Sequence, residues 1–257
     1  MAIGRPKRAA GFTLPLTMAL AFSLMALATA IVGMVLVSDK QSKAAASDLI
    51  TRTSLESAIE AGLFDLEQNG EPQATDWAAE RTVGAQGVTL VVADARYKPD
   101  VNTGSVDQVA GAVADPGLRE RMLAALTPPG DAQLRAPYTR FVDFAEAVGA
   151  SAAEEDCLRR RITIGRTDPV APAPPATNFA PPRVPLTVGA VIDVRAETRD
   201  WEGRREVLWR RARYTGRPEL PWLTHDWRLL RLGRSDPGCP APPAAASAFT
   251  NALHPGR

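Results

Sequence analysis

Histidine is almost missing from this sequence, which has only two, His225 and His254, among 257 residues. A histidine-based metal centre needs three or four ligands at workable spacing, so that kind of site is not expected. The only serines that stand out, Ser105 and Ser151, lie where helix caps are predicted and have no base nearby in sequence to activate them as nucleophiles. The sequence therefore predicts a protein that is not an enzyme and that holds no cofactor.

An excess of charge of one sign is lacking too. Lys and Arg number 30 and Asp and Glu number 29, which gives a net charge of +1. A nucleic-acid-binding surface needs a clear basic excess, so nucleic acid is not expected as a partner. The run Arg159 to Arg161 is too short for that role and is interpreted as a solvated basic face.

Acidic residues suggest two metal candidates, and each has a simpler explanation. Glu154 to Asp156 are consecutive on an expected helix and point in different directions, so they are interpreted as favourable charges at a helix N-terminus. Asp94, Asp100 and Asn102 would suit a cation-binding turn, but local capping is the preferred interpretation. No metal site is predicted.

Cysteine is scarce as well. The two cysteines, Cys157 and Cys239, lie 82 positions apart. In an oxidising compartment such a pair can form a disulfide, which here would tether the C-terminal tail to the middle of the domain. Two unpaired thiols are the alternative, and the sequence alone leaves both open.

What the sequence has in plenty is an uncharged, mostly apolar stretch, since no charged residue occurs between Arg8 and Asp39. This exceeds the roughly 18–20 residues that a helix needs to cross a bilayer. Arg5, Lys7 and Arg8 precede it without an acid, which predicts a cytoplasmic N-terminus by the positive-inside rule. We expect a single-pass inner-membrane protein whose chain beyond Asp39 is periplasmic if the source is a diderm bacterium.

Three kinds of N-terminal segment fit this pattern. A cleaved secretory signal would end at Ala28-Thr29-Ala30, but the apolar run continues past it from Ile31 to Val37. A plain uncleaved anchor is the second. The third is a prepilin leader, which is cut before the apolar run rather than after it.

The third interpretation rests on a resemblance. The stretch from Arg8 through Gly11-Phe12-Thr13-Leu14 resembles the cleavage region of type IV prepilins. The resemblance implies that a prepilin peptidase cuts after Gly11 and that the new N-terminal residue, Phe12, is N-methylated. Most pilins carry Glu as the fifth residue of the mature chain, whereas this sequence has Leu16. The K-type minor pseudopilin of type II secretion (general secretion pathway protein K) typically shows that departure.

Beyond the leader, 1–11, one long helix is predicted. It comprises a transmembrane and assembly segment, 12–38, and a periplasmic continuation, 39–70, that ends at Asn69-Gly70. Its continuation carries apolar residues that we expect on one face: Leu49, Ile50, Leu55, Ile59, Leu63 and Leu66.

The rest is predicted to be α+β, with residues 71–234 forming a small domain of short helices and an antiparallel sheet. A strand is expected at 87–94, helices at 106–114, 118–126, 141–148 and 151–160, and a brief strand at 162–164. A proline-rich loop at 168–185 precedes a hairpin, 190–198 with 206–214, then a strand at 225–232 and a disordered Pro/Ala-rich tail at 235–257.

Four tryptophans concentrate in the last quarter of the chain: Trp201, Trp209, Trp222 and Trp227. Core packing is their default role. A partner surface is the sharper alternative, because Trp and Arg dominate interface hot spots.

The order of these features resembles the K-type pseudopilin over most of its length. The matching pieces, besides the leader and membrane helix, are Glu60-Ala61-Gly62, the strand 88–94, Asp100-Val101-Asn102-Thr103, Phe144 to Gly149 followed by Ile162-Thr163-Ile164, and Asp226-Trp227-Arg228. The resemblance implies a pilin-like domain at or near the tip of the type II secretion pseudopilus, which supports protein export.

The resemblance also implies partners, namely other minor pseudopilins, the major pseudopilin, prepilin peptidase and the lipid of the inner membrane. Larger family members hold calcium in an inserted helical domain, but the segment before Phe141 is short here and has no obvious acidic cluster, so calcium is not carried over. The alternative function is a single-span periplasmic scaffold or binding protein with an uncleaved anchor.

Overall fold

The computed structural model describes residues 13–72, 77–127, 137–165, 183–200, 202–236 and 238–239, without the side chains of 13–16, 72 and 77. The predicted leader with Gly11 and Phe12, the side chain of Leu16 and most of the predicted disordered tail lie outside these residues. The chain divides into two compact units, Met1–Leu49 and Ile50–Arg257.

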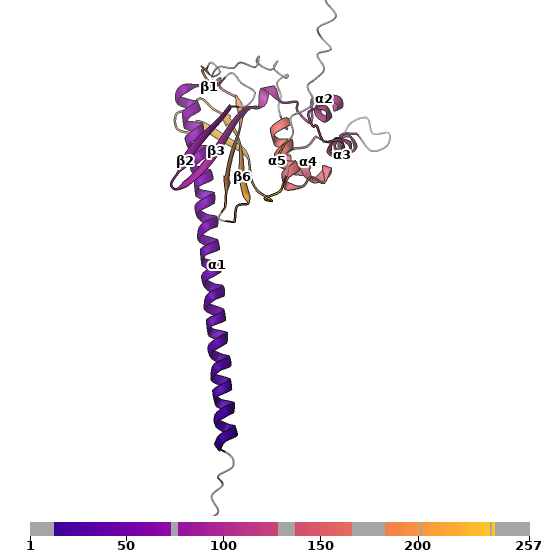
Figure 1. Ribbon diagram of the computed structural model, residues 1–257. Helices are drawn as coiled ribbons and strands as arrows, with labels where there is room; N and C mark the ends of the chain where they lie inside the picture. The colour runs from indigo at the N-terminus through magenta and orange to yellow at the C-terminus, as the bar shows by residue number, and fades with distance from the viewer. Residues whose placement is uncertain are drawn as a thin grey trace, which may run out of the picture. The chain divides into compact units, whose positions relative to one another are not determined.

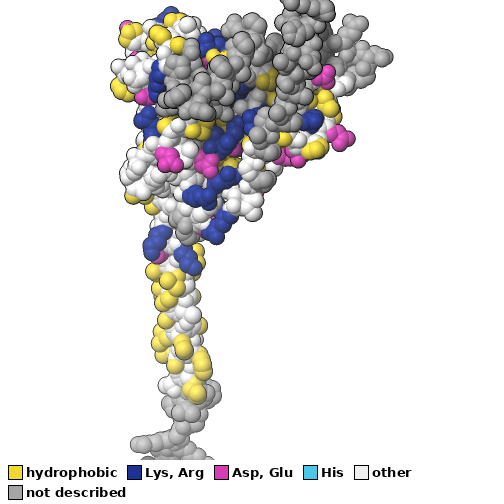
Figure 2. Space-filling view, turned by 45° about the horizontal axis from the view of Figure 1, so that its top comes forward, with side chains coloured by type: hydrophobic (Ala, Val, Ile, Leu, Met, Phe, Trp, Pro, Cys, Tyr) yellow, Lys and Arg dark blue, Asp and Glu magenta, His cyan; other side chains and the backbone are white. Residues whose placement is uncertain are grey.

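The first unit consists of the beginning of helix α1, which runs from Thr13 to Asn69 (Figure 1). The apolar side chains of this first part of α1 are exposed from Met18 to Val37 (Figure 2). Among the described residues α1 is the one helix long and apolar enough to cross a membrane. The hydroxyls of Ser23 and Thr29 donate to the carbonyls of Ala19 and Met25 at 2.8 and 2.7 Å. These polar groups are therefore satisfied within the helix, as lipid requires.

The remainder of α1 supplies the core of the second unit. Leu55, Ile59 and Leu63 are buried, as predicted, but Leu49 and Ile50 are exposed. The prediction was wrong for these two residues because the buried face of α1 begins only at Thr51.

Two glycines explain how closely the sheet approaches α1 and where this helix ends. A Cβ on Gly62 would lie 2.5 Å from Cδ2 of Leu90, so the sheet approaches the helix closely at this point. Gly70 has φ +77° and its N–H donates to the Leu66 carbonyl at 2.8 Å, which ends the helix where the Asn-Gly pair predicted.

An antiparallel sheet of five strands packs against this part of α1, in the order β2-β3-β5-β6-β7. The strands are β2 (Trp77–Val83), β3 (Gln86–Asp94), β5 (Val191–Arg199), β6 (Arg205–Tyr214) and β7 (Trp222–Leu232). The predicted hairpin and third strand are confirmed, so the fold is α+β. Strand β2 was not predicted.

A second, two-stranded sheet pairs β1 (Glu71–Pro72) with β4 (Arg183–Val184). The prediction of an irregular loop over 168–185 was therefore wrong at its C-terminal end. The two strands meet because Arg183 reaches the end of α1, where its guanidinium donates to the Asp65 carboxylate at 3.0 Å and to the Gly70 carbonyl at 3.1 Å.

The helices form a separate layer. They are α2 (Val106–Gly111), α3 (Pro116–Leu126), α4 (Phe141–Val148) and α5 (Ala152–Arg161), with a 3₁₀ turn, η1 (Ala95–Tyr97), before them. Ser151 and Glu154 make the predicted capping box of α5. The predicted strand at 162–164 is reduced to a single parallel bridge between Thr163 and Asp100.

Strand alternation gives the five-stranded sheet two different faces. On β5, Ile192, Val194 and Ala196 join the apolar core with α1, while the intervening Asp193 and Arg195 are buried on the opposite face. The helices have an apolar core of their own, built around Phe141 and Phe144. Figure 1 shows the sheet lying between α1 and the layer of helices. The helical layer therefore meets the sheet through the charged side chains of β5 and also through a small apolar cluster. In that cluster, side chains of β6 and β7 pack against Ala152 and Ala153 of α5.

Candidate functional site

The structure offers no metal centre in the part of the chain that it describes, because no three His, Cys, Asp or Glu side chains come together there. Asp94 accepts a hydrogen bond from the Arg96 backbone N–H at 2.7 Å. Asp100 accepts from the N–H groups of Asn102 and Thr103 at 2.8 and 3.1 Å. These carboxylates cap turns, which was the preferred interpretation.

Of the two histidines, the structure describes His225, which belongs to strand β7. His225 lies at the irregularity where β7 pairs with Ala212 on one side and Arg211 on the other. Burial lowers its pKa, and the nearby positive charges of Arg213 and Arg211 lower it further. His254 lies outside the described residues.

The acidic residues of α5 were predicted to be charges at the helix N-terminus, and the structure shows that this description is incomplete. Glu154 does cap the helix, but Glu155 and Asp156 are buried. Asp156 accepts from Nε and Nη2 of Arg195 at 2.8 and 3.0 Å and from Nε1 of Trp209 at 2.8 Å. Burial raises the pKa of Asp156, but the hydrogen bonds and charge of Arg195 outweigh that effect and leave the pKa below its usual value.

The interpretation of Arg159 to Arg161 as a solvated face was wrong for Arg159, which is buried. Its Nε donates to Glu155 at 2.9 Å and its Nη1 to Asp226 at 2.6 Å. Its guanidinium also lies 4.5 Å from the centroid of the Phe141 ring. Arg159 therefore connects α5 with both β7 and the core of the helical layer.

A second buried carboxylate completes the interface between the helical layer and the sheet. Asp193 on β5 accepts from Nζ of Lys98 at 2.8 Å and from Nε and Nη2 of Arg211 at 2.6 and 3.0 Å. Burial raises the pKa of Asp193, but the charges of Arg211 and Lys98 dominate and hold it far below its usual value. We call the contacts of Asp156, Arg159 and Asp193 the ionic interface.

A disulfide fastens the chain to the same helix. Cys157 on α5 and Cys239 are bonded, with their Cα atoms 4.9 Å apart. The bond holds the residues that follow β7 against α5, beside a cavity of about 410 Å³ that Leu118 and Cys157 help to line.

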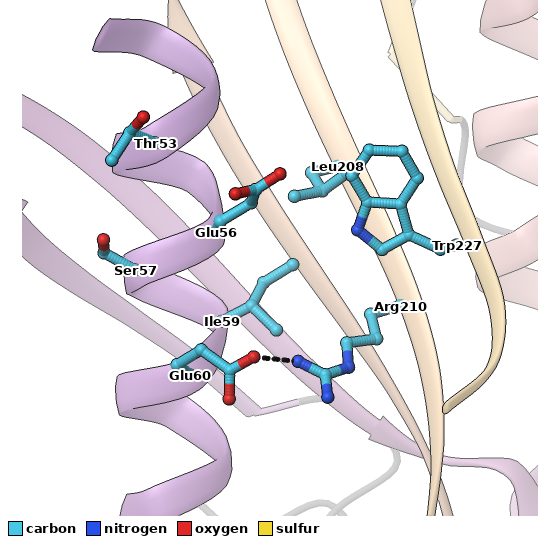
Figure 3. Close-up of a pocket in the computed structure, with 8 residues that line it drawn as sticks. All are labelled: Thr53, Glu56, Ser57, Ile59, Glu60, Leu208, Arg210 and Trp227. Atoms are coloured by element: carbon cyan, nitrogen blue, oxygen red, sulfur yellow. Dashed lines mark hydrogen bonds and ion pairs between the residues drawn. The ribbon is translucent and has the colours of Figure 1, made fainter. Parts of the chain in front are cut away.

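A groove of about 510 Å³ lies between α1 and the sheet (Figure 3). Its lining residues are Thr53, Glu56, Ser57, Ile59 and Glu60 of α1 with Leu208, Arg210 and Trp227 of the sheet. We call it the α1–β7 groove. Glu60 and Arg210 form an ion pair across it, and Nε of Arg210 donates to the Thr224 hydroxyl at 2.9 Å.

The tryptophans divide between core and surface. Trp209 and Trp222 are buried, as the default role predicted, whereas Trp227 is 40% exposed beside the groove. The Arg52 guanidinium lies 4.9 Å from the centroid of the Trp227 ring. Trp227 is therefore the described tryptophan that suits a partner surface, and Trp201 lies outside the described residues.

No protein-family model, no curated protein and no solved structure matches this chain. The motifs in the sequence, the physical character of α1 and the surfaces of the second unit are therefore the features that bear on its function.

Proposed function

We propose that the chain is a K-type minor pseudopilin, a structural component at or near the tip of a type II secretion pseudopilus. The observation that carries the proposal is helix α1. It is continuous from Thr13 to Asn69, exposes apolar side chains in its first part and contributes the core of an α+β domain with its second. A helix with both properties suits a subunit that is anchored in lipid and later packs among other helices.

The apolar part of α1 needs a non-aqueous environment at every stage. Side chains such as Met18, Phe22 and Met34 are more than half exposed. Lipid provides that environment in the inner membrane, and the helices of neighbouring subunits provide it in a pseudopilus. When the helix moves from the membrane into the pseudopilus, it exchanges apolar contacts with lipid for apolar contacts with other helices. The helix can therefore serve both as anchor and as assembly element.

The processing motif supports the same proposal from sequence. Cleavage after Gly11 would make Phe12 the mature N-terminus and Leu16 the fifth residue. In pilins the Glu at that place is thought to pair with the N-terminal amine of a neighbouring subunit. Because Leu16 has no charge to offer, no further subunit would be added by that pairing, which suits a position at the tip.

The proposed location is the inner membrane, with the N-terminus in the cytoplasm and the second unit in the periplasm. The basic residues Arg5, Lys7 and Arg8 support that orientation. The disulfide between Cys157 and Cys239 supports an oxidising compartment for the folded unit. The role is one of packing, and we propose no catalytic activity.

A pull-down tests the assembly role. The full chain, tagged at its C-terminus, is purified from detergent-solubilised membranes and probed for the other minor pseudopilins and the major pseudopilin. We expect the minor pseudopilins to co-purify. A Gly11→Leu variant, which should escape cleavage, serves as the matched control and should lose them. Equal recovery of pseudopilins with both variants, or their absence from both, would favour an uncleaved single-span scaffold instead.

A further inference from the structure

Two carboxylates and one guanidinium meet beyond the C-terminal end of α1. Nη2 of Arg96, on η1, contacts Oε1 of Glu71 on β1 and Oδ2 of Asp94 at the end of β3. Nε of Arg96 also donates to Asp94 at 2.6 Å. Because both carboxylates contact the same nitrogen, they lie close together, and two negative charges face one positive charge. We call Glu71 and Asp94 the carboxylate pair.

The carboxylate pair is buried. Glu71 is 4% exposed and Asp94 is 5% exposed. Oε2 of Glu71 is buried and accepts no hydrogen bond from the residues that the structure describes. A buried carboxylate oxygen without a donor loses the hydration that it has in the unfolded chain. The ionised form of Glu71 is therefore unfavourable in the folded state.

The charged side chains gathered around the end of α1 come from five elements: Asp94 of β3, Arg96 of η1, Arg183 of β4, Arg81 of β2 and Asp65 of α1. The guanidinium of Arg183 donates to Asp65 at 3.0 Å, and Nη2 of Arg81 lies 4.0 Å from the same carboxylate. Arg96 is therefore the cation whose contacts with the carboxylate pair define its charge balance.

Glu71 is the member of the pair whose proton binding responds to this environment. Burial raises the pKa of Glu71 above its ordinary value of 4.5, the charge of Asp94 raises it further, and the charge of Arg96 offsets only part of the rise. Arg96 keeps its charge, because its hydrogen bond to Asp94 raises its already high pKa. A proton on Glu71 turns this carboxyl into a donor toward Asp94 and leaves one negative charge against one positive charge.

Glu71 also belongs to a very short sheet. Strands β1 and β4 have two residues each, and Glu71 pairs with Val184 (Figure 1). We call this pairing the β1–β4 clasp. Two short strands contribute little stability by themselves, so the charge of one buried side chain can decide whether they stay paired. If β1 separated from β4, Glu71 would reach solvent, where its ionised form is hydrated.

We propose that Glu71 and Asp94 share one proton and that this proton closes the β1–β4 clasp, which is therefore a pH-sensitive device at the end of α1. The closed clasp binds the proton more tightly than the open one, because only the closed form buries the two carboxylates together. The stabilisation is complete below pH 4.5 and is lost as the pH rises through the folded pKa of Glu71. This inference does not depend on the pseudopilin assignment, because it concerns only the second unit.

Hydrogen exchange of the full chain in detergent measures the clasp directly. Protection factors, which correct for the intrinsic pH dependence of exchange, are compared at pH 8 and pH 4.5 for the backbone amides of Glu71, Arg183 and Val184. We expect these protection factors to be at least about threefold higher at pH 4.5. The amides of β5 and β6 are the internal reference and should change less.

Variants assign the response to the carboxylate pair. Glu71→Gln carries a permanent amide donor in place of the shared proton, so its clasp should be as protected at pH 8 as that of wild type at pH 4.5. Asp94→Asn leaves one carboxylate for the guanidinium, so the rise in acid should disappear. Glu120→Gln is the matched control, since Glu120 is exposed on α3, and it should behave as wild type.

Three results would overturn the proposal: wild-type protection that is equal at both pH values or lower in acid, a full pH response in Glu71→Gln, or a full response in Asp94→Asn. The last result would mean that burial of Glu71 alone causes the response and that no proton is shared. If Glu71→Gln does not fold, the responses of wild type and Asp94→Asn still decide the question.

Discussion

Replacing Asp193 by Asn removes the charge at the centre of the ionic interface. The Asp193 carboxylate is only 3% exposed and accepts three hydrogen bonds, at 2.6 and 3.0 Å from Arg211 and 2.8 Å from Lys98. The amide of Asn cannot accept all three and carries no charge, so two buried cations remain without their counter-ion. Breaking a buried pair in this way costs about 3–5 kcal/mol.

The free energy of unfolding is measured by urea titration of the full chain in detergent, with the disulfide kept oxidised. Asp143→Asn on α4, which breaks the solvent-exposed pair with Arg140, is the control and should leave the unfolding curve unchanged. The double variant Asp193→Asn with Lys98→Met should recover part of the loss, because one unpaired cation is removed. A loss below about 1 kcal/mol for Asp193→Asn would refute the account of the ionic interface.

The pH dependence gives this prediction a second readout. The folded pKa of Asp193 is depressed below the unfolded value, which is about 3.9. Its contribution is therefore complete above that value and is lost as the pH falls toward the folded pKa. The stability difference between wild type and Asp193→Asn should be constant from pH 5 to 7 and should narrow below about pH 4. A difference that stays constant in acid would contradict the assignment.

Three further changes test other parts of the fold by the same unfolding assay. Trp209→Phe keeps an aromatic side chain but removes the indole N–H that donates to Asp156 at 2.8 Å, and should cost about 1–3 kcal/mol. Cys239→Ser should cost about 2–4 kcal/mol by freeing the segment after β7, and wild type reduced with dithiothreitol should match it. Gly70→Ala should cost about 1–3 kcal/mol, because φ is +77° and the added Cβ would lie 2.2 Å from a carbonyl oxygen of β4. Gly111→Ala is the control for the last of these, because a Cβ added there would meet no neighbouring atom within 4 Å, and it should be neutral or slightly stabilising.

The features that local pattern predicts well are those with strong local signals. The end of α1 follows from the Asn69-Gly70 pair, and the capping box of α5 follows from Ser151 and Glu154. The hairpin of β5 and β6 follows from alternation on both sides of a turn. In each case the signal and the structure that it specifies lie within a few residues.

The features that were missed depend on partners far along the chain. Alternation on β5 indicates two faces, but it does not reveal that α5 covers the charged one, since Asp156 and Arg195 lie 39 positions apart. The same lack of context made Arg159 resemble a surface residue. Strand β2 has little alternation of its own and is recognised only by its pairing with β3.

The candidate site shows the same division. The clustering of tryptophans suggested a partner surface, but only the structure shows that Trp227 is the exposed one of the three it describes and that Glu60 and Arg210 meet beside it. These two residues are 150 positions apart. No local pattern would have joined them.

Mass spectrometry of the mature N-terminus is the most direct test of the proposed function. The full chain is purified from the membranes of its own host, and its N-terminal peptide is sequenced. A pseudopilin should begin at Phe12 with one methyl group on the amine, and the basic residues through Arg8 should be absent. A chain that still begins at Met1 or Ala2 would contradict the proposal and leave α1 as a plain membrane anchor.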